Sequence, residues 1–251
     1  VGQQPGGETL FADWHVDYTA ERERQSFLTS FVHICESRPR TMLIIEPALS
    51  FALRGSIAWE RLLHKEAAAA AFKCVTKVMS GTTRVSFLCF AISSGALPKM
   101  QVLGEGEGVY GNTIGDAGMS ALAGAIASRP LPNLRYLTLA VNKIGDAGMN
   151  ELSRAIASRS MTSLRWLDVS FNQIGDAGVK GLFGGAGIEA LLNLQGLSLS
   201  NNSIGEEGIN VLAAAIESLK SLRLLFVGDG PLGTEHPRLR AVCKQRKILL
   251  N

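Results

Sequence analysis

Hydrophobic and polar positions return at a fixed distance through the second half of this chain. The string Ile-Gly-Asp-Ala-Gly begins at Ile114, Ile144 and Ile174, and Ile-Gly-Glu-Glu-Gly begins at Ile204, a spacing of 30 residues each time. A second pattern, Leu-x-x-Leu-x-Leu-x-x-Asn with Val169 at one of the Leu positions, begins at Leu134, Leu164 and Leu194. A pattern that returns at a fixed period of 20–50 residues predicts an array of stacked structural repeats.

The leucine-rich part of each unit predicts a short strand. Its apolar residues alternate with polar ones, so Leu137 and Leu139 are expected to point inward while Tyr136 and Thr138 point outward. Asn142 follows where the chain must turn, and its amide can donate to and accept from backbone groups that lack strand partners. The sequence therefore predicts a ladder of buried asparagines along the array.

The second half of each unit predicts a turn and a helix. Gly145 permits a tight turn, and Asp146 lies where the N-cap of a helix is expected, with its carboxylate accepting from the first helical amides. One apolar stripe at helical spacing follows, formed by Met149, Leu152, Ala155 and Ile156. A single unit cannot bury its apolar face alone, so the units are expected to stack and to need caps at the ends.

This pattern resembles the ribonuclease-inhibitor-like class of leucine-rich repeats, which includes the repeats of NOD-like receptors and of Ran GTPase-activating proteins. The motif from Leu134 to Asp146 carries the resemblance, which covers about residues 91–251. It implies an α/β fold: a right-handed solenoid in a horseshoe arc, with a parallel sheet on the concave face and helices on the convex face.

The repeats divide the chain into two parts. Residues 1–90 are expected to form an irregular, mostly helical region, with candidate helices over residues 20–35 and 56–79. This region is interpreted as an N-terminal cap, a damaged set of repeats or a separate small helical module, and the sequence does not distinguish between them. Residues 91–251 form the predicted solenoid. Its C-terminal cap is placed at residues 222–251, where Gly230 replaces the Asn and a short basic helix over 238–247 turns Leu239, Val242 and Cys243 to one side.

Two departures from the repeat carry their own predictions. The unit before Ile114 is longer by four residues, and the extra residues in 104–111 predict a loop. The third unit places four glycines across its helix, and each costs about 1 kcal/mol against Ala. We therefore expect that helix to be shortened or broken near 184–187.

Composition and charge limit the classes of partner and the compartment that the sequence favours. The chain is 46% hydrophobic and 19% charged, with a net charge of +3 and no dense basic tract, which argues against nucleic acid. The longest apolar run, 85–97, is shorter than the ~20 residues of a membrane-spanning helix, so no membrane span is expected. Four widely spaced cysteines favour reduced thiols and hence a cytoplasmic protein. We expect a monomer.

The candidates for chemistry are weak. The glycines of 106–111 match a dinucleotide fingerprint formally, but Glu105 and Glu107 beside them would repel a pyrophosphate, and a loop is the simpler interpretation. His33 and Cys35 lack a second ligand pair with metal-binding spacing. Three further candidates have structural explanations: Cys74 and Cys89 lie in apolar surroundings, and the aspartates at 116, 146 and 176 share one repeat position. The sequence predicts neither a catalytic site, nor a cofactor, nor a metal.

What remains is the outward face of the predicted sheet. Aromatic and arginine side chains recur there, and these residue types dominate protein-interface hot spots. The candidate partner-binding residues are Arg135, Tyr136, Thr138, Arg165, Trp166, Asp168, Ser198 and Phe226. The alternative explanation is that Tyr136 and Trp166 pack against each other across neighbouring strands.

These observations favour a non-catalytic module, and not an enzyme, that binds another protein on its concave face. The resemblance suggests two alternatives. One is a GTPase-activating protein of the Ran type, and the other is the ligand-sensing repeat fragment of a larger receptor.

Overall fold

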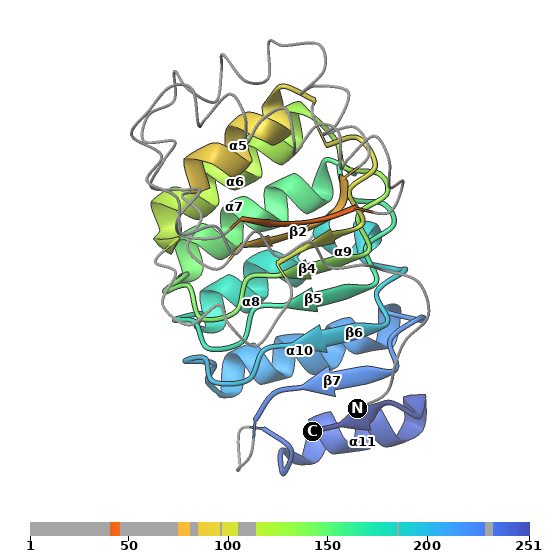
Figure 1. The fold of residues 1–251 in the computed structure, drawn as a ribbon. Helices are drawn as coiled ribbons and strands as arrows, with labels where there is room; N and C mark the ends of the chain where they lie inside the picture. The colour runs from red at the N-terminus through yellow and green to blue at the C-terminus, as the bar shows by residue number, and fades with distance from the viewer. Residues whose placement is uncertain are drawn as a thin grey trace, which may run out of the picture.

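The computed structural model describes residues 41–45, 75–80, 85–95, 97–104, 114–184, 186–228 and 233–251 (Figure 1). Eight parallel strands lie side by side in the order of the sequence and form one open sheet. They are β1 (Thr41–Ile45), β2 (Val75–Ser80), β3 (Val102–Leu103), β4 (Tyr136–Thr138), β5 (Trp166–Asp168), β6 (Gly196–Ser198), β7 (Leu224–Phe226) and β8 (Leu249–Leu250).

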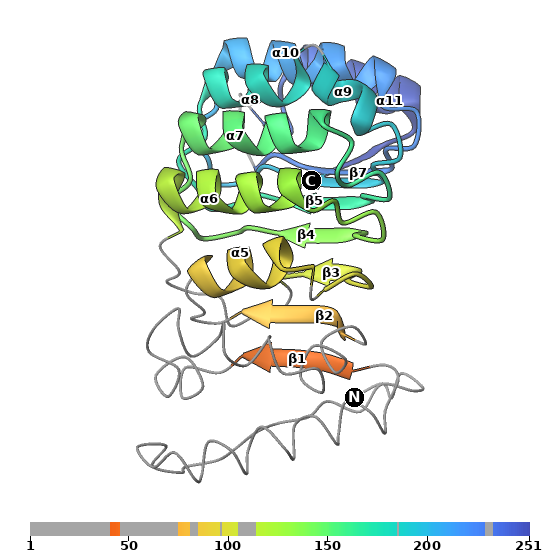
Figure 2. The same ribbon diagram turned by 90° about the horizontal axis from the view of Figure 1, so that it is seen from above.

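The helices cover one face of this sheet (Figures 1 and 2). They are α5 (Val85–Ser93), α6 (Gly115–Ser128), α7 (Asp146–Ala157), α8 (Asp176–Phe183), α9 (Ala186–Ala190), α10 (Glu206–Ser218) and α11 (Pro237–Arg246). Neighbouring strands are ~4.8 Å apart, whereas packed helices need 8–10 Å. The array must therefore curve with its sheet on the inside, which confirms the predicted solenoid with a concave sheet and convex helices.

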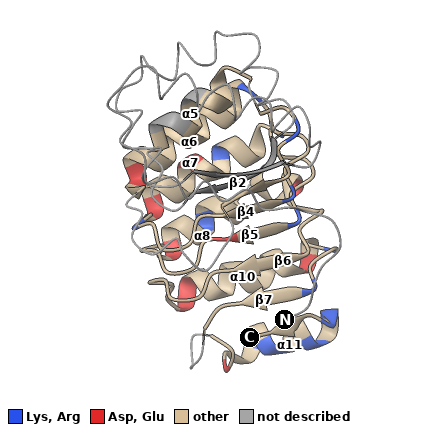
Figure 3. Cartoon of the chain, in the orientation of Figure 1, with Lys and Arg blue, Asp and Glu red and all other residues tan. Residues whose placement is uncertain are grey.

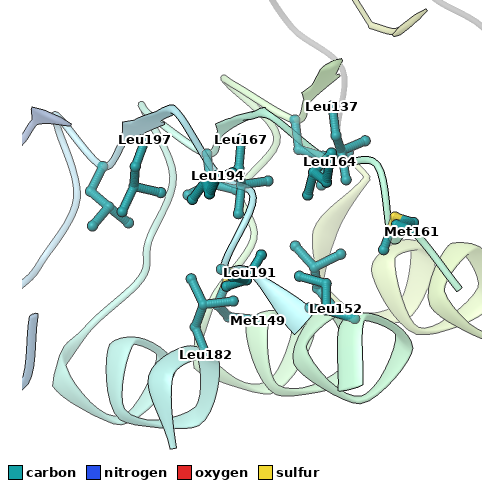
Figure 4. Close-up of a cluster of buried hydrophobic side chains, with 14 of the residues drawn as sticks. Leu137, Met149, Leu152, Met161, Leu164, Leu167, Leu182, Leu191, Leu194 and Leu197 are labelled. Carbon is teal, nitrogen blue, oxygen red and sulfur yellow. The ribbon is translucent and has the colours of Figure 1, made fainter. Parts of the chain in front are cut away.

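The leucines of successive repeats align in adjacent strands. Leu137 is paired with Leu167, which is paired with Leu197, which is paired with Leu225. All four are fully buried. Figure 4 shows strand leucines such as Leu137, Leu167 and Leu197 facing Met149, Leu152 and Leu182 from the helices. The predicted inward positions are thus the core of the array.

The predicted asparagine ladder is present. The Oδ1 atom of Asn172 accepts from the backbone N–H groups of Asn142 and Ile144, both at 3.0 Å, in the preceding repeat. Its Nδ2 atom donates to the carbonyls of Leu139 and Val169, each at 2.9 Å. Asn172 therefore bonds to groups of two repeats at once, and so does Asn202, through Ile174 and Val169 of the preceding repeat and Leu199 of its own. The Nδ2 atom of Asn142 donates only within its own repeat, to the carbonyls of Leu139 and Ala140.

The aspartates do cap helices, but the predicted partner is wrong. Asp146 is the first residue of α7, where Gly145 is the N-cap and no side chain caps the helix from within it. Instead, the Oδ1 atom of Asp146 accepts from Gly175 N at 2.7 Å and Gly178 N at 2.8 Å, at the start of the next helix. Asp116 and Asp176 make the same pair of bonds one repeat earlier and later. Each carboxylate thus links two repeats.

The sheet extends further toward the N-terminus than the repeat pattern indicates. Strand β2 pairs with β3, so the predicted boundary at residue 90 does not coincide with an end of the sheet. The helix expected over 56–79 is wrong for its last residues, because Val75 to Met79 belong to β2 and extended pairing with β1 and β3 prevails there. The helix predicted over 20–35 lies outside the described residues.

Both irregular regions of the array that the structure describes agree with the sequence. Helix α8 ends at Phe183, Gly184 is extended, and a separate short helix α9 follows, which confirms the predicted break. In the C-terminal cap, helix α11 buries Leu239, Val242 and Cys243, and strand β8 adds to the sheet. Of the loop predicted over 104–111, residues 105–111 lie outside the described residues, as does Gly230.

Candidate functional site

The face of the sheet away from the helices presents one row of side chains per strand position. In the middle row, Tyr136 is paired with Trp166, Trp166 with Gly196, and Gly196 with Leu224. Tyr136 leaves 43% of its surface exposed, whereas Trp166 and Leu224 are half-buried. Tyr136 is therefore the most accessible aromatic side chain on the described strands.

Trp166 lies over a glycine of the next strand. A Cβ atom built on Gly196 would be 2.0 Å from Cε3 of the indole. The absence of a side chain at Gly196 therefore leaves the space that the Trp166 ring occupies. On the far side, the rings of Trp166 and Phe226 meet edge to face with centroids 6.0 Å apart. Trp166 packs toward β6 and β7, and Phe226 shares that contact. The glycine at 196, which stands where neighbouring repeats carry a large side chain, was the signal in the sequence for this packing.

The remaining predicted polar contacts are less available to a partner. The Oδ1 atom of Asp168 accepts from the backbone N–H of Ser170 at 3.0 Å and from its hydroxyl at 2.6 Å. Ser198 exposes 8% of its surface, and Thr138 is half-buried. Asp168 therefore stabilises the turn after β5, and Ser198 offers little surface for contact.

The two predicted arginines lie in a polar row where the strands begin. The row runs through Arg135, Arg165, Gln195 and Arg223, and all four are exposed. Backbone bonds join them in register: Arg165 N donates to Arg135 O at 2.8 Å, Gln195 N to Arg165 O at 2.7 Å, and Arg223 N to Gln195 O at 2.8 Å. We call these four residues the arginine row. Arg223 continues the row at the start of β7.

A second exposed aromatic lies at the opposite end of β5. Phe171 exposes 57% of its surface and has a φ of 53°, in the left-handed region. Val141 and Asn201 adopt the same conformation one repeat away on either side, with φ of 60° and 55°. Asn tolerates this region, but Val and Phe do so at a cost of about 1–2 kcal/mol. Sequence reasoning missed Phe171 because the repeat pattern leaves its position unspecified.

The described thiols are not activated. Burial raises the pKa of the Cys243 thiol to about 11, and burial is the main cause that raises the pKa of Cys89. Both thiols stay protonated at neutral pH, which opposes nucleophilic chemistry. The candidates His33, Cys35 and Cys74 lie outside the described residues.

The described part of the chain contains no group of three His, Cys, Asp or Glu side chains placed to hold a metal ion. Among the helices that the structure describes, none has both the length and the apolar character to cross a membrane.

The repeat geometry agrees with a family comparison. The model described as "Leucine Rich repeat" matches residues 110–123, 131–153 and 160–183. The chain therefore contains leucine-rich repeats over these residues. Its repeats are of the ribonuclease-inhibitor-like class, because α6, α7 and α10 are full α helices that alternate with the strands.

Several solved structures resemble this leucine-rich-repeat protein in fold. "Leiomodin-1 Actin-Binding Site 2 (ABS2)" is 15% identical over 63% of this chain and 84% of its own, with a TM-score of 0.47. The tropomodulin C-terminal domain of Caenorhabditis elegans is 16% identical over 65% and 93%, with a TM-score of 0.49. A protein of Bacteroides fragilis is 13% identical over 92% and 71%, with a TM-score of 0.49. No curated protein matches the chain.

Proposed function

We propose that this leucine-rich-repeat protein is a non-catalytic module that binds another protein on the concave face of its sheet. The observation that carries the proposal is the exposure of Tyr136. Its aromatic ring leaves 43% of the residue's surface open on a strand paired on both sides, while the neighbouring Trp166 is packed down over Gly196. A rigid aromatic side chain presented in this way is a typical anchor of a protein interface.

The sheet around Tyr136 supports such an anchor because its backbone is fixed. Tyr136 N donates to Gln101 O at 3.0 Å, and Trp166 N donates to Arg135 O at 2.9 Å. The contact between Trp166 and Phe226 gives the surface an apolar part beside Tyr136. A partner would therefore meet a surface that is already ordered, which reduces the entropy cost of binding.

The three aspartates that recur in the repeats have a structural task. Asp116, Asp146 and Asp176 each hold two backbone N–H groups of the next repeat. A carboxylate that accepts two backbone donors in every repeat has a structural task, which explains why aspartate recurs at this position.

Photo-crosslinking tests the proposal. The crosslinking amino acid p-benzoylphenylalanine, itself aromatic, replaces Tyr136 in one variant and Lys180 in another. Lys180 is a matched control because its side chain is 70% exposed on α8, on the convex face. After irradiation in an extract of the source cells, we expect a discrete adduct from position 136 and none from position 180.

Two results would contradict the proposal. One is a set of adducts that is the same from both positions, and the other is an adduct from the convex position alone. Thermal unfolding of both variants, followed by circular dichroism, checks that each retains the fold.

A further inference from the structure

We infer that the arginine row selects the partner by binding an acidic segment of a protein. This inference rests on the proposed function, because it names the chemistry of the partner at that same surface. It starts from the placement of Arg135, Arg165 and Arg223 at one end of adjoining strands.

Strand pairing fixes the spacing of these arginines along the backbone. Arg135 and Arg165 precede directly paired strands and are ~4.8 Å apart along the sheet, while Arg165 and Arg223 are two strand spacings apart, or ~10 Å. Gln195, an uncharged hydrogen-bonding residue, lies between the last two. The row is therefore a line of donors that crosses four strands at right angles to their direction.

The charges of the row are not balanced by the described part of the chain. Three ion pairs occur there, Arg154 with Glu151, Arg159 with Glu189, and Lys180 with Glu207, and none includes a member of the row. The guanidinium of Arg223 donates to two backbone carbonyls, those of Lys220 and Leu222. Like charges on neighbouring strands destabilise a sheet. A bound anion would reduce the repulsion between the arginines and so stabilise the folded protein.

Two acidic groups of the described residues, Asp168 and Glu189, have other partners. Asp168 lies at the other end of β5, where its carboxylate is held by Ser170. Glu189 faces Arg159, with 3.9 Å between the carboxylate and the guanidinium. Figure 3 shows basic segments where β4, β5 and β7 begin, with an acidic segment beside β6 on the same side, and a series of acidic segments on the opposite side, where the helices begin.

This distribution favours an acidic protein segment over a nucleic acid. Guanidinium groups bind carboxylates in pairs of charge-assisted hydrogen bonds, and Tyr136, next to Arg135, adds an aromatic contact typical of protein interfaces. A polynucleotide that followed the row would instead approach a molecule with a net charge of only +3 and an acidic opposite edge.

Fluorescence anisotropy with a short labelled peptide that alternates Glu and Ala tests the inference. The double substitution Arg135→Gln/Arg165→Gln removes two charges from the row. The matched control Arg154→Gln/Lys180→Gln removes two charges from the convex helices. We expect saturable binding that weakens with added NaCl. The row variant should lose roughly tenfold in affinity, while the control changes less than about twofold.

Three outcomes would overturn the inference: no saturable binding of the peptide, equal losses in both double variants, or tighter binding of a labelled oligo-dT that depends on the same arginines. Self-association that the row variant abolishes, seen by sedimentation velocity, would assign the row to a second copy of this chain and also overturn it.

Photo-crosslinking from position 136 in the Arg135→Gln/Arg165→Gln background separates this inference from the proposed function. If the adduct persists undiminished, the inference fails and the proposed function stands. If no adduct forms from position 136 even with the arginines present, the proposed function itself fails.

Discussion

A single carboxylate joins each repeat to the next. Asp146 begins helix α7 but binds two N–H groups at the start of α8. The last motif carries Glu206 at the equivalent position, and the cap that follows it has no Ile-Gly-x-x-Gly motif to hold. Aspartate at this position therefore marks a repeat that is followed by another of the same kind.

Replacing one of these aspartates should weaken the stack. Asp146→Ala leaves Gly175 N and Gly178 N without their acceptor, and a partly buried donor without a partner costs about 1–3 kcal/mol. The matched control is Glu206→Ala, which should change the free energy of unfolding by less than about 0.5 kcal/mol. Urea unfolding of both variants measures the difference. Equal losses would show that the carboxylate acts on its own helix.

The second glycine of each motif is needed to admit this aspartate. A Cβ atom on Gly148 would be 2.6 Å from Oδ1 of Asp116 and 2.9 Å from Cγ2 of Ile144. In contrast, a Cβ atom on Gly124, within α6, would meet nothing within 4 Å. The same substitution should thus have opposite effects at the two positions.

Gly124→Ala should stabilise the protein by about 0.5–1 kcal/mol, because Ala favours the helix more than Gly does. Gly148→Ala should destabilise it by about 1–3 kcal/mol, because the added methyl forces the neighbouring carboxylate away. Thermal and urea unfolding give both values. A stabilised Gly148→Ala variant would mean that the carboxylate is not held as described.

At the scale of strands and helices, the regular units could be predicted from the sequence and their exceptions only in part. Leu137 and Leu167 identify strands because, with apolar and polar residues alternating, only one strand register places all the apolar side chains on the buried face. The glycines at 181 and 184 identify the break between α8 and α9 because glycine disfavours helix. Local preferences of this kind act within one repeat and are visible in its residues.

Contacts between elements were harder to predict. Strand β2 lies in a segment whose composition favours helix, and its pairing with β1 and β3 is decided by residues distant in the sequence. The packing of Trp166 over Gly196 needs the register of two strands 30 residues apart. That Tyr136 and Trp166 lie on the outward face of the sheet could be predicted, while their division into an exposed Tyr136 and a covered Trp166 required the neighbouring strands.

On the scale of the whole molecule, the repeat gives the solenoid two different edges. Acidic residues Asp116, Asp146 and Asp176 begin the helices, where they complement the positive ends of the helix dipoles. The strands begin at the opposite edge, where the arginine row lies. Stacking of the units thus places residues of like charge side by side along each edge of the solenoid.

Each unit of the solenoid is held mainly by its nearest neighbours. Deleting residues 145–174 removes one whole unit and joins Ile144 to Gly175, so that Asp116 meets Gly175 and Gly178, and β4 meets β6. Deleting residues 160–174 removes half a unit, including β5, and leaves α7 out of register with the strands. The two variants differ in whether the repeat period is kept.

Urea unfolding of these two deletion variants, followed by circular dichroism, tests whether contacts between neighbouring units hold the solenoid together. The variant lacking 145–174 should unfold in one cooperative transition with a smaller m-value, because it buries less surface, and with a lower free energy of unfolding, because one interface is lost. The variant lacking 160–174 should show no cooperative transition over the repeats. If the whole-unit deletion is as disordered as the half-unit deletion, the stacked-repeat account is contradicted.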